Sequence, residues 1–217
     1  MKEFKTTSLA DQVFDRLEND IIQGVYPRGE ILTELKLVEQ LNVSRTPIRE
    51  ALRRLEQERL IEETGKGSLV LGITEDDLVD IMNIRCHIES LASYYATVNM
   101  TPDGLKLLRN TVDLQEFYYS KKDPDHMRLM DDQFHETICK LSKRTVICDT
   151  LLPLHRKTRR YRRASIADEN RTAKMIEEHR GIFEAISSKN AELAAELTKQ
   201  HITNAKDNMI ERMKNHG

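Results

Sequence analysis

Apolar residues recur at three- and four-residue intervals through most of the chain, which is the spacing of one buried face of an α-helix. In the first third, the pattern predicts helices over about 7–23 and 33–41, and a third helix that starts at or just after Ser44. Beyond residue 74, no strand pattern or internal repeat interrupts the helical period. The helices predicted there span about 75–98, 102–121, 124–142, 144–163, 170–188 and 190–215. We therefore expect a mainly α-helical protein.

A different pattern follows residue 60. Two short segments, Ile61-Glu62-Glu63 and Ser68-Leu69-Val70-Leu71, flank the glycine-containing turn Thr64-Gly65-Lys66-Gly67 and predict a β-hairpin. Three helices followed by a hairpin are typical of a winged helix-turn-helix, so we expect residues 1–73 to form a DNA-binding domain. An acidic run at 75–77 suits the start of the next helix. Residues 74–217 are expected to form an all-helical bundle.

The stretch 41–55 has the features of a turn followed by a recognition helix. Asn42 tolerates the left-handed conformation of a sharp turn, Ser44 can cap the helix, and Pro47 lies in its first turn. The inward face is apolar and consists of Ile48, Ala51, Leu52 and Leu55. The other faces carry Arg45, Thr46, Arg49 and Arg53. These side chains suit contacts with bases and phosphates, although an arginine-rich face on an ordinary solvated helix is the simpler alternative. The flanking helices and hairpin favour DNA binding.

Composition limits the possible partners and compartment. The net charge of −2 provides no bulk attraction to a polyanion, so DNA binding has to come from the local placement of arginines. Three cysteines without CxxC spacing and an N-terminus without an apolar signal core predict a cytoplasmic protein with reduced thiols. No segment approaches the roughly 20 apolar residues that span a bilayer, so we expect no membrane association.

Several polar residues lie on the inward faces of the second half. Arg85 shares a face with apolar neighbours, and a buried guanidinium needs a carboxylate or phosphate partner. Glu89, one turn further along, could supply that partner within the helix. A bound ligand could supply it equally well. The sequence leaves both readings of Arg85 open.

Four further residues have the chemistry of metal ligands. Asp131 and His135 are one helical turn apart, while His179 and His201 lie on apolar stripes of two later helices. A single inward histidine is more often a hydrogen-bonded core residue than a ligand. Three imidazoles and one carboxylate together suit zinc, nickel, manganese or iron(II), and do not suit calcium. We therefore predict a divalent transition-metal site.

The N-terminal motifs resemble the GntR family of bacterial transcription regulators. The resemblance covers residues 7–72 and is carried by 24–32, 41–52 and 55–61, with Asn42 and Arg59 standing where the family usually has glycine. It implies that the recognition helix contacts DNA through Arg45, Thr46 and Arg49, and that the wing tip does so through Gly67.

The C-terminal half resembles the FadR-like branch of that family, which has an FCD ligand-binding domain. The resemblance is carried by Arg85, Leu91-Ala92, 131–135, 178–182 and His201-Ile202, while 143–145 departs from the usual Gly-Asn-Pro. It implies that Asp131 and the three histidines bind a divalent metal and that Arg85 helps to hold a small carboxylate effector. Asn204, one turn beyond His201, is a weaker candidate for the effector pocket.

These features together predict a homodimeric regulator that binds double-stranded operator DNA. Dimerisation is expected because one small module makes few base contacts and two-fold symmetry doubles them. The resemblance implies control by a small organic acid, with repression relieved by the acid as the commoner outcome. A purely structural metal is one alternative. A metalloenzyme is a weaker one, because the sequence has no visible general base or oxyanion arrangement. The basic run 155–163 is interpreted as a largely solvated helix face, with a second DNA contact as its alternative.

Overall fold

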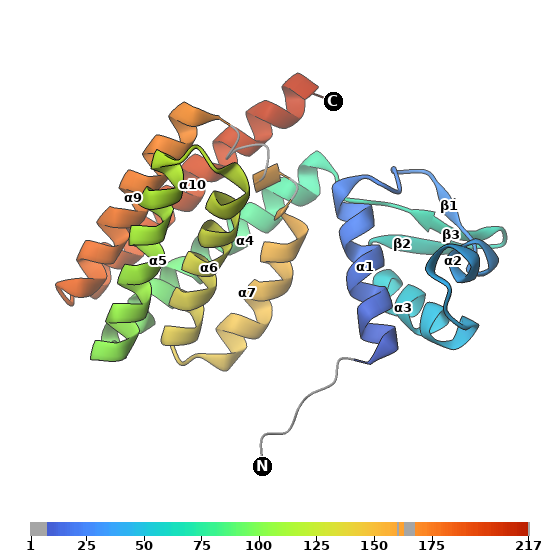
Figure 1. The fold of residues 1–217 in the computed structure, drawn as a ribbon, viewed down its shortest axis with the longest axis horizontal. Helices are drawn as coiled ribbons and strands as arrows, with labels where there is room; N and C mark the ends of the chain where they lie inside the picture. Colours follow the sequence, from blue (N-terminus) through green and yellow to red (C-terminus); the bar gives the residue numbers. More distant parts are fainter. Residues whose placement is uncertain (1–7, 160, 163–167, 217) are drawn as a thin grey trace, which may run out of the picture. The chain divides into compact units, whose positions relative to one another are not determined.

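The computed structural model describes residues 8–159, 161–162 and 168–216, and the side chains of 169 and 213–216 lie outside this description. The chain divides into two compact units, Met1–Thr74 and Glu75–Gly217 (Figure 1). The first unit contains α1 (Leu9–Gln23), β1 (Ile31–Leu32), α2 (Glu34–Leu41), α3 (Arg45–Gln57), β2 (Ile61–Thr64) and β3 (Gly67–Val70). The second contains α4 (Glu75–Val98), α5 (Pro102–Ser120), α6 (Pro124–Leu141), α7 (Thr145–Lys157), α9 (Glu169–Ser187) and α10 (Ala191–His216). The predicted fold class, a winged helix-turn-helix followed by a helical bundle, is confirmed.

The turn between α2 and α3 has the predicted geometry. Asn42 adopts a left-handed conformation with φ of 51°, which lets the chain leave α2 and enter α3 within three residues. Ser44 occupies the N-cap position with an extended backbone, but its side chain makes no capping hydrogen bond, contrary to our expectation. Arg59, just beyond α3, also has a positive φ of 56°. Such a conformation is easiest for glycine, which explains why the family usually has glycine at both positions.

The wing is a three-stranded antiparallel sheet with the order β1-β3-β2. The predicted hairpin is present as β2 and β3, but the sequence analysis missed β1 because two residues are too few to show a period. Gly67 pairs with Thr64 in this hairpin. A Cβ atom at Gly67 would lie 2.6 Å from the carbonyl oxygen of Leu32, and its φ is 129°. Only glycine fits here, because β1 approaches the backbone of β3 so closely.

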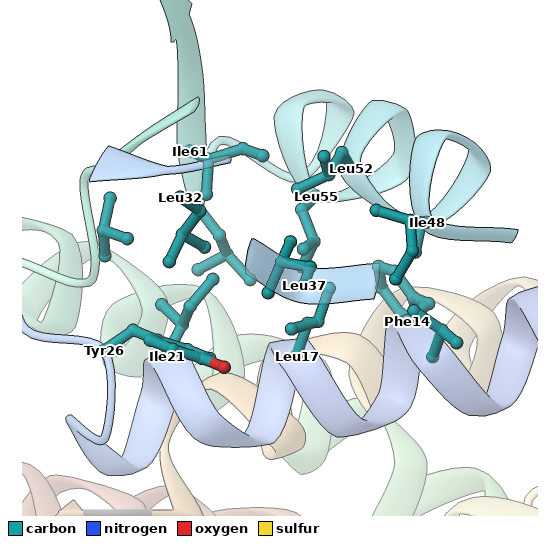
Figure 2. Packing of buried hydrophobic residues seen from close by; sticks show 14 residues of the cluster. Phe14, Leu17, Ile21, Tyr26, Leu32, Leu37, Ile48, Leu52, Leu55 and Ile61 are labelled. Carbon is teal, nitrogen blue, oxygen red and sulfur yellow. The ribbon is translucent and has the colours of Figure 1, made fainter. Parts of the chain in front are cut away.

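The core of the first unit lies between α1, the two other helices and the sheet. Phe14, Leu17 and Ile21 line one face of α1 and meet Ile48 and Leu55 of α3 (Figure 2). Each of these side chains is almost fully buried. The same residues that point inward from α3 therefore fix which side of that helix is left for solvent.

The second unit is a bundle in which α4 packs against α6, α7, α9 and α10, while α5 packs against α6 and α9. Its apolar core includes Leu108 of α5, Phe134 of α6 and Ile182 and Ile186 of α9. Among the described residues, no helix is long and apolar enough to cross a membrane. A bundle of this kind brings side chains from helices that are distant in sequence to a common interior.

Two of the three cysteines differ from expectation. Cys139 near the end of α6 and Cys148 near the start of α7 form a disulfide, so the prediction that all thiols are reduced is wrong for this pair. The reason is the short turn after α6, which contains Lys143 with φ of 55° and leaves the two Cα atoms 5.6 Å apart. Cys86 remains a buried free thiol.

Candidate DNA-binding surface and metal centre

The polar face of α3 is exposed, as predicted. Arg45, Thr46, Arg49 and Arg53 all face solvent. Nε of Arg49 donates to both carboxylate oxygens of Glu34 at 2.8 and 2.9 Å. An exposed ion pair of this kind contributes little to stability, so Arg49 can exchange Glu34 for a phosphate or a base at little cost. The turn of the wing is also exposed at Gly65 and Lys66.

The structure brings the four predicted metal ligands together inside the bundle. Asp131 and His135 come from α6, His179 from α9 and His201 from α10. Nε2 of His201 lies 3.2 Å from Nε2 of His179 and 3.4 Å from Nε2 of His135. Oδ1 of Asp131 is 3.8 Å from Nε2 of both His135 and His179. All four side chains are at least nine-tenths buried.

Each histidine of this cluster is held through its other ring nitrogen. Nδ1 of His135 lies 2.6 Å from Oε2 of Glu89, and Nδ1 of His201 lies 2.6 Å from Oε2 of Glu178. Nδ1 of His179 lies 3.0 Å from Oε1 of Gln115. A carboxylate or amide oxygen only accepts, so each Nδ1 has to carry the proton. Each Nε2 then presents a lone pair to the centre of the cluster.

This donor set fits a metal ion. Three lone pairs and a carboxylate oxygen that face one another repel unless a cation lies between them. Nitrogen atoms bound at about 2.05 Å to one tetrahedral metal ion lie about 3.3 Å apart, close to the spacing of the Nε2 atoms. The acceptors behind the imidazoles are the arrangement usual around metal-bound histidines, where they fix the tautomer and the orientation of the ring.

The protonation states agree with this arrangement. Burial, together with the neighbouring imidazoles, lowers the pKa of His179 well below its ordinary value, and burial also lowers the pKa of His201. Burial would raise the pKa of Asp131, but the charges of Arg162 and its other neighbours together outweigh it and hold this pKa below its ordinary value. In the same way, burial would raise the pKa of Glu89, but Arg85 together with His135 and His155 keeps it well below the usual range. These shifts favour neutral imidazoles at His179 and His201 and an ionised carboxylate at Asp131, the forms that bind metals.

The two predicted effector residues lie directly behind this cluster. Arg85 is buried, and its Nε donates to Oε1 of Glu89 at 2.8 Å. The intrahelical partner considered in the sequence analysis is therefore present. Asn204 donates to Oε1 of Glu178 at 2.8 Å. Both residues thus hold a carboxylate that in turn holds a ligand histidine.

A narrow cavity adjoins the cluster. It is lined by residues of α4, α6, α9 and α10 together with Arg162. The charged residues among them are Arg85, Asp131, Arg162 and Arg171, and Asn204 is not among the described lining residues. The cavity thus brings arginine side chains next to the candidate metal ligands.

Sequence reasoning missed several residues of this region. Gln115 and Arg171 gave no pattern that distinguished them from a solvated helix face, and Glu178 was noted only as part of the motif 178–182, without a role of its own. The basic run 155–163 was recognised, but it was interpreted as a largely solvated helix face. That interpretation needs correction, because His155, Thr158 and Arg162 are buried. Their spacing of three and four residues places them on one inward face, which could have been recognised. Arg160 and Arg163 of this run lie outside the described residues.

Comparisons with known proteins agree with the fold and the motifs. Residues 9–70 match the model of the bacterial regulatory proteins of the gntR family, and residues 80–204 match the FCD domain. The chain belongs to the GntR family, in the branch with an FCD domain. Arg45, Thr46, Arg49, Arg53 and Gly67 lie in the GntR match, and the four metal-type ligands lie in the FCD match.

Individual relatives are regulators too. The uncharacterized HTH-type transcriptional regulator YdhC of Bacillus subtilis is 28% identical over 91% of this chain and 88% of its own length. The gluconate operon transcriptional repressor of Bacillus licheniformis is 31% identical over 63% of this chain and 56% of its own. The solved structure of E. coli McbR/YncC has the same fold, with a TM-score of 0.78, 22% identity and coverage of 95% of this chain and 99% of that one. This GntR protein is therefore a DNA-binding transcription regulator, and its relatives are regulators rather than enzymes.

Proposed function

We propose that this GntR regulator is a homodimeric repressor whose binding to operator DNA is controlled by a small carboxylate at a metal centre in the FCD domain. The protein would act in the cytoplasm, where operator DNA is found. Arg45, Thr46, Arg49 and Arg53 would contact the major groove, and the backbone at Gly67 would contact DNA from the wing. The N-terminal end of a recognition helix is the part that enters the groove in this class of fold.

The observation that carries the proposal is the convergence of three buried imidazoles, with Oδ1 of Asp131 at 3.8 Å from Nε2 of His135 and His179. His135, His179, His201 and Asp131 would hold zinc, nickel, manganese or iron(II). When bound, the metal supplies positive charge and, in five- or six-coordinate ions, open positions for oxygen donors. The adjoining cavity supports a regulatory site rather than a purely structural metal. A structural metal is normally enclosed by its protein ligands, whereas a regulatory site needs space beside the metal for the effector.

The effector would be a small organic acid in that cavity. Our sequence-based candidates for its binding were Arg85, which lines the cavity, and Asn204, which supports Glu178 behind His201. The acid can release the operator only if it binds more tightly to the arrangement of the two units that is poor at DNA binding. One relative is named for the gluconate operon, so gluconate is a reasonable first acid to test.

A stripe on α4 supports the proposed homodimer. Ile84, Leu91 and Val98 follow one another at seven-residue intervals and are 46%, 50% and 61% exposed. Apolar side chains at this spacing form the contact line between two packed helices, and exposed apolar stripes mark interaction surfaces. A second copy of α4 is the simplest partner, because a two-fold axis would place the same stripe on both sides.

One experiment tests the metal and effector parts of the proposal. The protein is purified without chelators and its metals are measured. Its affinity for an operator, selected from a random pool of DNA duplexes, is then followed by fluorescence anisotropy during titration with gluconate, lactate, malate and citrate. We expect about one metal per chain and a loss of operator affinity of at least fivefold with one acid, abolished by chelation. One metal per chain without any acid response would favour a structural metal, and no metal would refute the assigned centre.

A further inference from the structure

Three arginines line the cavity beside the metal cluster, but only two of them have buried donors without a partner. Arg85 donates from Nε to Glu89 and from Nη1 to the hydroxyl of Thr158 at 2.8 Å. Two of its three guanidinium nitrogens are thus committed to protein atoms. The carboxylate that it holds, Glu89, also contacts Nδ1 of His135 and Nε2 of His155 at 2.6 and 3.0 Å. Arg85 is therefore connected to the metal ligand His135 through Glu89.

Arg171 is different. It lies near the start of α9, and only 9% of its side chain is exposed. Its Nη2 donates to Oε2 of Glu178 at 3.0 Å, but Nε and Nη1 are buried and have no hydrogen-bond partner. Buried unpaired donors on a cation are costly, so natural proteins keep them where something else completes the site.

Arg162 repeats this arrangement from the segment after α7. Its side chain is 5% exposed, and Nη1 binds Asp132 and lies 3.2 Å from Oδ2 of Asp131. Its Nη2 is buried without a partner. Arg162 and Arg171 thus have three unpaired guanidinium nitrogens, and both residues line the cavity that the metal ligands Asp131, His135 and His201 also line. A carboxylate has two oxygen atoms, so it can accept one charge-assisted hydrogen bond from each arginine.

We propose that Arg162 and Arg171 bind the carboxylate of the effector, whereas Arg85 acts as a positioning residue for His135 through Glu89. This inference rests on the proposed function and changes the residues that recognise the acid. Because the same cavity is also lined by metal ligands, the acid would have a second oxygen donor, such as a hydroxyl, oxo or further carboxylate group, directed at the metal. Small hydroxy acids, sugar acids and dicarboxylic acids have this chemistry.

Glu178 would couple the acid to the metal. Its Oε2 lies 2.6 Å from Nδ1 of His201 and accepts from Nη2 of Arg171 at 3.0 Å. A carboxylate bound at Nε and Nη1 of Arg171 would share this guanidinium with Glu178, so Arg171 and Glu178 would connect the acid to the metal ligand His201. By reciprocity, the factor by which the acid changes metal affinity equals the factor by which the metal changes acid affinity.

The test uses the metal-loaded full chain and the variants Arg171→Met, Arg162→Met and Arg85→Lys. Arg180→Met is the matched control, since Arg180 is on the same helix but pairs with Glu116 and Asp113 at the surface. Metal content is measured by elemental analysis, stability by thermal melting, and binding of gluconate, lactate, malate and citrate by calorimetry. Arg171→Lys is included because it keeps the charge but loses the planar fork.

We expect Arg171→Met and Arg162→Met, each compared with the wild type at full metal loading, to weaken the binding of the acid roughly 10- to 100-fold. Arg162→Met should also lower metal affinity, because Arg162 pairs with the proposed ligand Asp131. Without acid, the melting temperature of Arg171→Met should change little, because the change removes two unpaired buried donors but also the partner of Glu178. Arg85→Lys should lower metal affinity, and Arg180→Met should change neither property.

Two outcomes would overturn the inference in distinguishable ways. In the first outcome, the wild type binds one of these acids, and Arg171→Met and Arg162→Met bind it equally well. The two arginines then do not contact the acid, so this inference fails while the proposed function stands. If the wild type binds none of the four acids, the effector part of the proposed function fails and the inference fails with it.

Discussion

The two units of this regulator hold their charged residues in opposite ways. On α3, Arg45, Arg49 and Arg53 face solvent, and Arg49 has only an exposed carboxylate beside it. In the bundle, Arg85 and Arg162 are almost fully buried within a network of carboxylates and imidazoles. An exposed arginine is free to meet a partner from outside, whereas a buried one has to be satisfied from within.

In the first unit, the arginines proposed to contact DNA should therefore contribute little to stability. In the second unit, the buried charged residues should contribute both to the stability of the fold and to the proposed site. Removing an exposed arginine from α3 would take away a proposed DNA contact and little else. Removing a charge from the bundle leaves its partner buried and unpaired, so the fold, the proposed metal centre and the proposed effector site should respond together. The following substitutions test that distinction.

The largest effect is expected for Glu89→Gln. This change removes the charge between Arg85, His135 and His155 and leaves Arg85 buried without its counter-ion. We expect the free energy of unfolding of the bundle, measured with urea, to fall by about 3–5 kcal/mol. Glu136→Gln is the control, since Glu136 forms an exposed pair with Lys140 and should change stability by less than about 1 kcal/mol. Equal effects of the two changes would contradict the contrast between buried and exposed charges.

The next effect concerns the metal. His179→Ala removes one Nε2 donor and also the ring that stacks on Phe134. We expect metal affinity to fall at least about 100-fold, more than for loss of a residue behind a ligand. His87→Ala should retain full metal content in the same elemental analysis, because His87 is exposed on α4. Full occupancy in His179→Ala would remove this residue from the proposed centre.

An intermediate effect is expected for Arg49→Ala. Loss of one arginine contact should weaken binding to the selected operator by about 1–3 kcal/mol, or roughly 5- to 150-fold. Metal content and melting temperature should stay unchanged, because the pair with Glu34 is exposed. The control is Lys106→Ala, an exposed cation on α5 of the other unit. Operator affinity that is the same for both variants would argue against α3 as the recognition helix.

The smallest effect is expected for Gly67 of the wing, where the close approach of β1 should exclude any side chain. Gly67→Ala places a Cβ 2.6 Å from the carbonyl oxygen of Leu32, so the stability of the DNA-binding unit should fall by about 1 kcal/mol or somewhat more. Gly65→Ala lies two residues earlier in the same turn, and a Cβ there would have no heavy atom within 4 Å. Thermal melting should therefore distinguish these two glycines. Similar melting curves would show that the hairpin can move away from β1.

Most of the fold and the types of site residue could be predicted because they depend on neighbours along the chain. The recognition helix, the turn at Asn42 and the hairpin follow from local spacing and conformational preference, and the inward placement of Asp131 and His135 follows from one helical turn. The short β1 could not be predicted, since its two residues pair with β3, more than thirty positions further along the chain. The disulfide between Cys139 and Cys148 was missed for a related reason, because its geometry depends on the turn between two helices.

The sequence by itself determined that this protein has a winged helix-turn-helix, a helical bundle and four inward residues of metal-binding type. Only the tertiary structure decided which partner each buried charge has. Arg85 meets Thr158, 73 residues away, and Glu178 stands between His201 and Arg171. The physical reason is that a hydrogen bond requires its donor and acceptor to lie about 3 Å apart in the right direction. Helical periodicity predicts which face of its helix a residue occupies. The packing of several helices then determines whether Arg85 or Arg171 has nitrogen atoms left for a ligand.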